Sequence, residues 1–192
     1  MKRVTHYPQF VLGLAFSWGA LLGFPALGLS LMDPTSGAAP AAACLYGSSI
    51  AWTVLYDTIY AHQDVKDDVK AGVKSIVVKH RAHTKILMTT LGVVQVGLLA
   101  SAGAVCGCGP VFYAVSCAGS AGALAYMVRK VDLEDVKQCW YWFKWCAWAV
   151  GIVTVGGGLA GEYVAVWSGV YGEEGWWGIG GSRRRMGYQN PN

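Results

Sequence analysis

Four long stretches of this chain contain no Asp, Glu, Lys or Arg, and they constrain its fold more than any other feature. They cover residues 4–32, 34–56, 86–128 and 145–161. An α-helix needs about 20 residues to cross the hydrocarbon core of a bilayer, so each run is near or above the length of one span. The third run is long enough for two spans, separated by the turn Cys106-Gly107-Cys108-Gly109-Pro110.

These runs predict an all-α, multi-span transmembrane bundle of about five helices. The expected spans are Tyr7–Leu31, Ala41–Tyr60, Ile86–Ala104, Val111–Met127 and Trp140–Gly161. Barrel strands would be about ten residues long and would alternate in polarity, unlike these runs. A composition of 54% hydrophobic and 14% charged residues also excludes a disordered chain. The first run is too long for the core of a secretory signal.

Basic residues are concentrated in alternate connections. Lys2 and Arg3 precede the first span, and the first connection carries only Asp33. The connection 64–85 holds six basic residues, the third connection holds none, and the fourth holds Arg129, Lys130 and Lys137. The positive-inside rule then places the amino end and the second and fourth connections on the cytoplasmic-equivalent side. The triplet at residues 183–185 in the Gly-rich tail departs from this pattern.

Other polar features support plain interpretations. The net charge of +4 is interpreted as topogenic charge because of the loop asymmetry. No basic stripe alternates with aromatics, so nucleic acid is not an expected partner. Cys106 and Cys108 could form a redox or metal pair, but small residues at a helix turn are the simpler reading because no second pair has zinc spacing. His80 and His83 lie among basic residues, which disfavours a zinc site.

The segment 56–75, YDTIYAHQDVKDDVKAGVKS, does not fit a plain membrane bundle. Asp57 lies at the end of a span, where a carboxylate is costly and indicates function. On a continuous helix Asp57, Asp64 and Asp68 would share one face, with Asp67 one turn from Asp64. Carboxylates without His or Cys suit Mg²⁺, and nearby Lys66, Lys70 and Lys74 suit a diphosphate. A solvated, charge-balanced loop is the alternative.

This segment resembles the second aspartate-rich motif of the UbiA-type membrane prenyltransferases, in the aromatic-acceptor branch. The stretch KRVTHYPQFVLGLAFSWGALLGFPA, residues 2–26, is similar to the same branch. The resemblance implies a nine-helix bundle, of which the five spans here match helices five to nine. It also implies Mg²⁺ bound by Asp64 and Asp68, with Asp67 as the additional acid of this branch.

The resemblance also assigns the neighbouring residues. Tyr56, Asp57 and Tyr60 match a YDxxYA element and are expected in a substrate pocket, and Lys74 is expected to contact diphosphate, with Lys70 and Lys66 beside it. The implied activity is Mg²⁺-dependent transfer of a farnesyl or longer prenyl group from prenyl diphosphate to an aromatic acceptor. Loss of diphosphate from an allylic carbon needs its growing charge neutralised, and an apolar cavity would protect the resulting cation from water.

The acceptor and the organelle remain open. The continuation VKDDVKAGVKS and the Trp-rich stretch 139–148 favour a polyketide-derived ring in fungal meroterpenoid synthesis. Alternatives are 4-hydroxybenzoate in ubiquinone synthesis or a non-catalytic membrane relic. The membrane is expected to be an endomembrane or the mitochondrial inner membrane. The Trp-rich stretch is an interfacial aromatic belt or, as a sharper alternative, the lining for a prenyl chain.

One part of the family pattern is missing. No NDxxDxxxD-like first motif occurs, and the chain contains no Asn-Asp pair. Residues 1–167 therefore resemble the carboxyl half of such an enzyme, followed by a Gly-rich tail, 168–192, that we expect to be disordered. We expect the chain to be inactive without an amino-terminal half.

Overall fold

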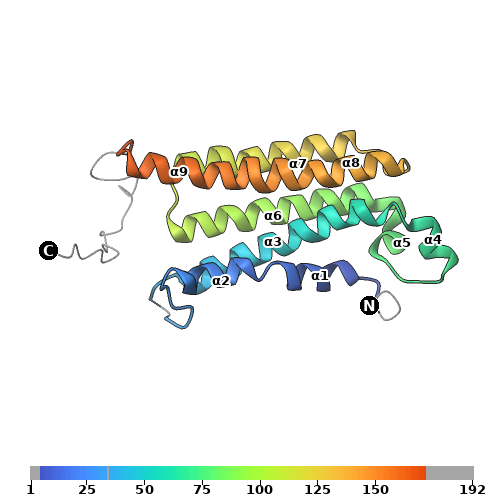
Figure 1. Cartoon of the computed structure of the whole chain (residues 1–192), viewed down its shortest axis with the longest axis horizontal. Coiled ribbons are helices and arrows are strands. Elements are labelled where there is room, and N and C mark those ends of the chain that lie inside the picture. Colours follow the sequence, from blue (N-terminus) through green and yellow to red (C-terminus); the bar gives the residue numbers. More distant parts are fainter. Residues whose placement is uncertain (1–4, 34, 172–192) are drawn as a thin grey trace.

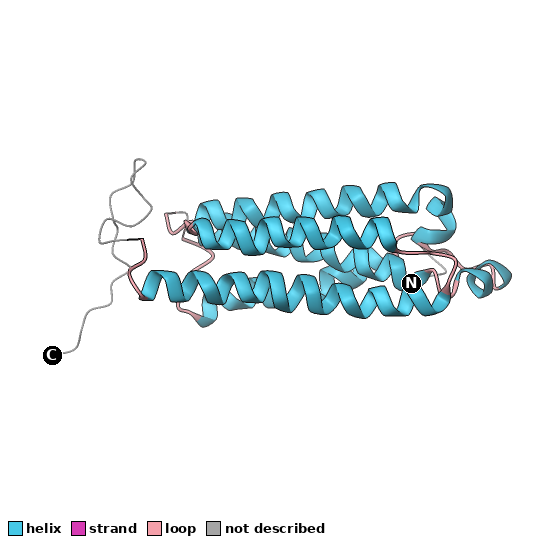
Figure 2. Ribbon diagram, turned by 90° about the horizontal axis from the view of Figure 1, so that it is seen from above, coloured by secondary structure: helices cyan, strands magenta, loops and turns pink. Residues whose placement is uncertain are grey.

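The computed structural model describes residues 5–33 and 35–171, and within these ranges every regular element is a helix (Figure 1, Figure 2). The prediction of an all-α bundle is confirmed. Most of the tail expected to be disordered, from residue 172 onward, lies outside the described residues, as do Lys2, Arg3 and the triplet at 183–185.

Two short helices replace the first expected span. They are α1 (Pro8–Phe16) and α2 (Gly19–Ala26), with a break at Ser17-Trp18. Pro8 suits the first turn of α1 because a residue there has no intrahelical partner for its N–H. Both helices pack on the next helix, where the Tyr46 hydroxyl donates a 2.8 Å hydrogen bond to the Leu14 carbonyl.

Helices α3 (Ala38–Ala61) and α6 (Thr84–Cys106) form the central pair of the bundle (Figure 1). Glycines in the left-handed conformation bound this pair: Gly37 (φ 69°) precedes α3 and Gly107 (φ 71°) ends α6. The Ser48 hydroxyl on α3 donates to the Gln95 carbonyl on α6 across 2.9 Å. The two central helices are therefore joined by a polar contact as well as by packing.

The connection between α3 and α6 is mostly helical. It contains α4 (Val65–Lys70), α5 (Ile76–His80) and the 3₁₀ turn η1 (Arg81–His83). Gly72 (φ 64°) ends α4, and the Ser75 hydroxyl accepts from the Val78 N–H at the start of α5. The expected third span, Ile86–Ala104, thus belongs to a longer helical segment, Ile76–Cys106.

Two further rods complete the bundle. The first joins the wide-turn π segment η2 (Phe112–Ala118) to α7 (Gly119–Lys130). The second joins α8 (Val136–Cys146), the π segment η3 (Ala147–Gly156) and α9 (Gly157–Trp167). The Asp135 carboxyl accepts from the Lys137 N–H and caps α8. The last rod is longer at both ends than the expected span Trp140–Gly161.

Among the described residues, four helical segments are long and apolar enough to cross a membrane. They are Pro8–Ala26, Ala38–Ala61, Ile76–Cys106 and Val136–Trp167. The segment containing η2 and α7 is helical, as expected for Val111–Met127, but it is rich in Gly, Ser and Ala and does not join these four. A span at that position stays a prediction.

The two ends of the bundle differ in charge. The start of α1, α4, α5 and the turn between α7 and α8 lie at one end in Figure 1, and the α2–α3 loop and the α6–η2 turn lie at the other. The basic connections therefore share one end, as the charge-based topology predicted.

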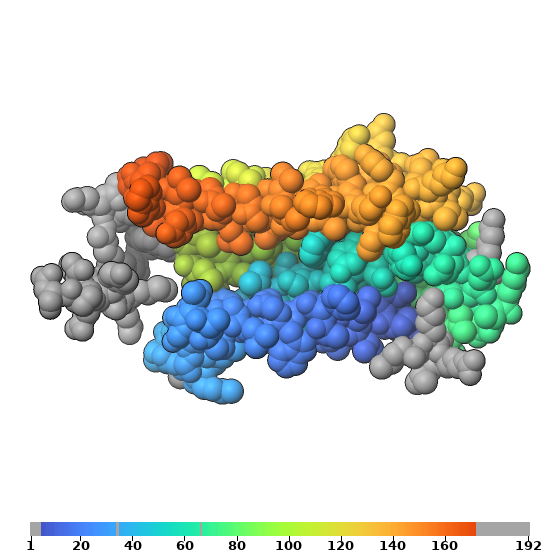
Figure 3. All heavy atoms as spheres, in the orientation of Figure 1, coloured from blue at the N-terminus to red at the C-terminus, as the bar shows by residue number. Residues whose placement is uncertain are grey.

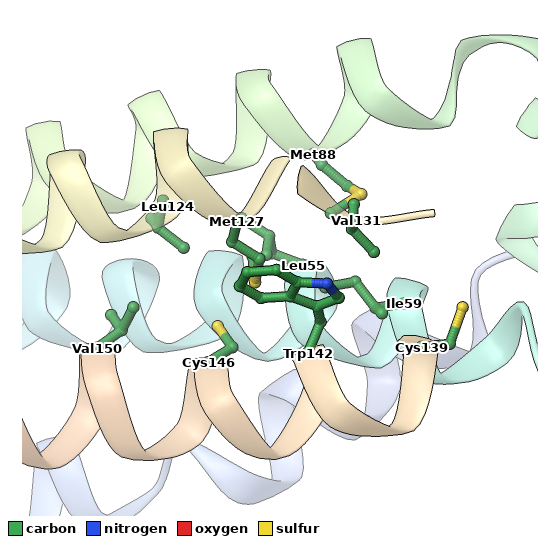
Figure 4. Close-up of a cluster of buried hydrophobic side chains, with 10 residues drawn as sticks. All are labelled: Leu55, Ile59, Met88, Leu124, Met127, Val131, Cys139, Trp142, Cys146 and Val150. Atoms are coloured by element: carbon green, nitrogen blue, oxygen red, sulfur yellow. The ribbon is translucent and has the colours of Figure 1, made fainter. Parts of the chain in front are cut away.

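Apolar side chains from α3, α6, α7 and the last rod meet in the main core (Figure 4). Leu55, Ile59, Met88, Met127 and Trp142 are among its members. Large apolar side chains also remain exposed along the outside, for example Val93, Ile152 and Tyr163. In a chain with these spans, such a surface is suited to contact with lipid.

Small residues bring the last rod close to η2. A Cβ at Gly158 would lie 2.0 Å from the Ser116 hydroxyl oxygen, and one at Gly161 would lie 3.2 Å from Val111. By contrast, Gly156 and Gly157 have more open surroundings. Among the glycines at positions 156, 157, 158 and 161, the close approach of the last rod to η2 therefore depends on Gly158 and Gly161.

A carboxyl group on α9 caps the helix that begins near Pro110. Glu162 is 8% exposed, and its Oε1 accepts from the Gly109 N–H. Its Oε2 accepts from the Phe112 N–H at 3.1 Å and from the Tyr171 hydroxyl at 2.9 Å. The cap satisfies backbone donors that have no partner within their own helix.

Candidate functional site

A cavity of about 410 Å³ lies between α1 and the end of α3, at the charged end of the bundle. Asp57, Tyr60 and Asp64 line it from one side, and Pro8, Gln9 and Leu12 are among the residues that line it from α1. The structure thus brings together three of the residues that the motif singled out. Figure 3 shows α3 between the α1–α2 layer and the last rod, on the face of the molecule shown there.

The carboxyl groups are not arranged as a continuous helix would place them. Helix α3 ends at Ala61, and Asp64 has non-helical dihedrals (φ −99°, ψ 0°) before α4 begins. The continuous helix on which a shared face of Asp57, Asp64 and Asp68 depends therefore does not form. Asp68 is buried, with 7% exposure, and it does not line the cavity.

Asp67 is directed to solvent. Its side chain is 86% exposed and lies 3.9 Å from the ammonium group of Lys70, itself 80% exposed. An exposed pair of this kind contributes little to stability. Within the described residues, no group of three or more His, Cys, Asp or Glu side chains is placed to hold a metal ion. The expected metal set of Asp64, Asp67 and Asp68 is therefore not gathered in one place in this structure.

The lysines expected at a diphosphate lie on α4 and after it. Lys70 and Lys74 are not among the residues that line the cavity, and Lys74 is half-buried. The side chain of Lys66 lies outside the part of the chain that the structure describes. Lys79 reaches the residue before α1, because its ammonium donates to the Tyr7 hydroxyl at 2.9 Å and lies 4.8 Å from the centre of that ring.

Sequence reasoning missed Gln9. Its side chain is 3% exposed, it lines the cavity, and its Oε1 has no hydrogen-bond partner. A buried acceptor without a partner costs free energy, so a donor at this position would stabilise it. The available signal was a lone amide within a charge-free run of the sequence.

A row of aromatic rings continues from the cavity onto the last rod. The Tyr60 ring lies 5.4 Å from that of Phe143, which in turn stacks on Trp140 at 5.6 Å with an interplanar angle of 19°. Tyr56 lies between Trp52 at 5.2 Å and Phe143 at 5.6 Å. Tyr60 therefore belongs both to the cavity and to this row, whereas Tyr56 belongs to the row.

The plain interpretations of the cysteines and histidines stay predictions. All six cysteines are free thiols, and Cys106 and Cys108 are not joined. The pKa of the Cys108 thiol is raised to about 11, chiefly by burial and then by nearby Cys106 and Glu162. His80 contacts the Tyr7 hydroxyl at 3.2 Å through Nε2.

Comparison with known proteins identifies a family. The model of the UbiA prenyltransferase family matches residues 1–169, which is most of the chain. No solved structure matches the chain.

Several curated relatives are closely similar. The chain is 50% identical over 144 residues to "4-hydroxybenzoate polyprenyltransferase, mitochondrial" of Schizosaccharomyces pombe, covering 75% of this chain and 39% of the relative. Identity to the protein of the same name from Saccharomyces cerevisiae is 45%, over 74% of this chain and 37% of the relative. Identity to "4-hydroxybenzoate geranyltransferase 2" of Lithospermum erythrorhizon is 42%, over 81% and 49%. The chain thus spans less than half the length of these three relatives.

Proposed function

Because the chain belongs to the UbiA prenyltransferase family, we propose that the cavity between α1 and α3 forms part of a site that transfers a prenyl group from a prenyl diphosphate to an aromatic acceptor. The observation that carries this proposal is the joint placement of Asp57, Tyr60 and Asp64 in one cavity at the charged end of the bundle. The family membership supplies the reaction class, and the cavity supplies residues suited to it.

We propose Mg²⁺ as the cofactor, with Asp64 and Asp57 as its protein ligands. Mg²⁺ in phosphate-handling sites is usually held by one or two carboxylates together with substrate phosphates and water, so two carboxyl groups in one cavity fit this ion. When bound, the ion would neutralise negative charge on the diphosphate. Asp67 and Asp68 remain further candidates from the family motif, as do Lys66, Lys70 and Lys74 for the diphosphate.

The residues of this chain would bind and shield the substrates. The unpartnered Oε1 of Gln9 can accept a hydrogen bond from a donor within the cavity. The ring row from Tyr60 to Phe143 and Trp140 offers an apolar surface for an isoprenoid chain. Such a surface would keep water from the carbon that loses diphosphate.

For the acceptor, the relatives favour a 4-hydroxybenzoate-type ring. Each of the three relatives is named for 4-hydroxybenzoate, including two fungal proteins named as mitochondrial. A polyketide-derived ring of fungal meroterpenoid synthesis is the second proposal. The amino-acid sequence of residues 65–75 and the Trp-rich stretch 139–148 support it. We further propose that a segment with the first aspartate-rich motif completes the site.

Binding of radiolabelled geranyl diphosphate tests the site directly. The full chain in detergent, with and without Mg²⁺, is compared with Asp64→Asn/Asp57→Asn and with a control of equal charge change, Asp33→Asn/Asp135→Asn, in which the asparagine side chain at position 135 can still cap α8. Loss of metal ligands should weaken Mg²⁺-dependent retention by more than about tenfold, whereas the control should match the wild type. Equal retention by all three proteins would overturn the assignment of the site.

A ligand-stabilisation assay separates the two acceptors. The melting temperature of the chain with geranyl diphosphate and Mg²⁺ is measured with added 4-hydroxybenzoate or with a 2,4-dihydroxy-6-alkylbenzoate of the polyketide type. Stabilisation by the first compound alone favours the ubiquinone-type acceptor. Stabilisation by the second alone favours the meroterpenoid acceptor.

A further inference from the structure

A second cavity, of about 640 Å³, lies at the same charged end of the bundle and is lined by several basic side chains. We propose that it binds the phosphate headgroup of an anionic membrane phospholipid. This inference does not depend on the prenyl-transfer proposal, because it rests on different residues.

The basic residues of this cavity come from two segments that lie far apart in the sequence. Arg81 and Lys85 belong to the helical segment Ile76–Cys106, in η1 and in the first turns of α6, and Arg129 and Lys130 belong to the last turn of α7. Each residue alone has an ordinary explanation as a topogenic charge or as a partner of a helix carboxyl end. Neither explanation requires all four to line one hollow. Their convergence is the feature that indicates a ligand.

The charges of the cavity are not balanced within the protein. Asp132 and Glu134 also line it, so four cations face two carboxyl groups. The Asp132 Oδ1 already accepts a 3.0 Å hydrogen bond from the Glu134 N–H within the turn between α7 and α8. Across the described residues, none of the four cations is in a salt bridge. An anionic group would relieve the mutual repulsion of these cations.

An amide in the wall of the cavity also lacks a partner. Gln63 lines the cavity, and its Nε2 is buried without a hydrogen-bond partner. A buried donor without an acceptor is unfavourable, and a phosphate oxygen is a strong acceptor. Two arginines that line the same cavity, Arg81 and Arg129, add planar donor groups that match phosphate geometry.

This cavity is distinct from the candidate prenyl-transfer site. His62, Gln63 and Val65 line the basic cavity, whereas Tyr60 and Asp64 line the cavity against α1. The two hollows therefore share the junction of α3 and α4 but no lining residue.

The position of the cavity favours a lipid over a soluble anion. It lies where α6 begins and α7 ends, at the end of the bundle that carries the basic connections. Basic pockets between helices on this side of a membrane suit anionic headgroups. A lipid would also cover adjacent apolar side chains such as Val136, which is 52% exposed and lines the cavity.

Lipid retention measured by native mass spectrometry tests the proposal. The full chain is purified from nanodiscs of phosphatidylcholine alone or with phosphatidylglycerol. The pocket variant is Arg81→Gln/Arg129→Gln, and the matched control is Lys137→Gln/Lys144→Gln, which removes the same charge without touching the cavity lining. A third variant, Arg81→Lys/Arg129→Lys, keeps the charge.

We expect the wild type and the control to retain phosphatidylglycerol in preference to phosphatidylcholine. The pocket variant should bind it about 10- to 30-fold more weakly, and the Lys variant should fall between them. Displacement of the lipid by added inorganic phosphate alone would show a soluble-anion site and overturn the proposal. Equal retention by the pocket variant and the control would overturn it as well, as would an absence of preference in the wild type.

If the pocket variant fails to fold, the Lys variant and the inorganic-phosphate competition on the wild type still decide the question. Geranyl diphosphate is also added to the lipid-bound protein. If it displaces the lipid from the wild type but not from Asp64→Asn, the basic cavity belongs to the prenyl-transfer site and a separate lipid site is refuted.

Discussion

Replacing Glu162 by Ala should destabilise the bundle more than any other single change of a carboxyl group described above. The side chain is buried on α9 and accepts from the N–H groups of Gly109 and Phe112, and from the Tyr171 hydroxyl. The two N–H groups belong to buried residues at a helix start, where no carbonyl of the same helix can replace the lost acceptor.

The size of the effect follows from these two donors. A buried donor left without a partner costs about 1–3 kcal/mol. Because the cap lies at the end of the bundle, where water can reach part of it, the lower half of that range applies to each. We expect Glu162→Ala to cost about 2–4 kcal/mol. Glu162→Gln keeps one acceptor oxygen and should cost about half as much.

Equilibrium unfolding in mixed micelles of dodecylmaltoside and SDS, followed by tryptophan fluorescence, measures both changes. Glu134→Ala is the control, since Glu134 is exposed and should change the free energy of unfolding little. Tyr171→Phe should have a smaller effect than Glu162→Ala and should be non-additive with it. Equal stability of Glu162→Ala and the control would refute the capping role.

Three further outcomes are expected. Gly158→Ala should lower the free energy of unfolding by about 1–3 kcal/mol in the same assay, because the new Cβ overlaps the Ser116 hydroxyl. Gly157 has open surroundings, so Gly157→Ala should be neutral. Similar losses for both variants would contradict the close approach at Gly158. The pKa of His62 is lowered from 6.5, chiefly by burial, so the folded state favours the neutral ring. The contribution of His62 to stability is present above pH 6.5 and is lost as pH falls through the lowered pKa. His62→Gln should therefore flatten the dependence of melting temperature on pH over that window. An unchanged dependence would contradict the lowered pKa of His62. Burial is the first cause of the raised pKa of Cys108 and remains in a variant that keeps Cys108 as its only thiol. The rate of its alkylation should therefore still rise above pH 9, and a plateau below pH 9 would contradict the raised pKa.

The positions of the helical rods could be predicted from the sequence because charges are excluded from a bilayer core. The charge-free runs located the five rods, of which four are long and apolar enough to cross a membrane within the described residues, and the basic loops ordered them correctly with respect to the two ends. Their exact lengths could not be predicted, since Ile76–Cys106 continues through residues such as Lys79 and Arg81 that hydropathy alone assigns to a loop.

The candidate site could be predicted only in part. Asp57, Tyr60 and Asp64 were found from the motif, and they share a cavity. Asp68 was misplaced because nothing local indicated that α3 ends at Ala61. Gln9 and Glu162 were missed for another reason: their surroundings come from segments far away in the chain, as in the contact between Glu162 and Gly109.

The wide turns of η2 and η3 have a consequence for how this chain tolerates insertions and deletions. Residues 147–156 separate the core position Cys146 from the capping residue Glu162 on the same rod. Removing one residue from this stretch would turn everything beyond it by about 100° around the helix axis. The close approach of Gly158 to Ser116 and the hydrogen bond between Glu162 and Gly109 would then be lost at the same time. We therefore expect natural length variation in this part of the family to fall in the turns between rods, and to leave the number of residues within η3 unchanged.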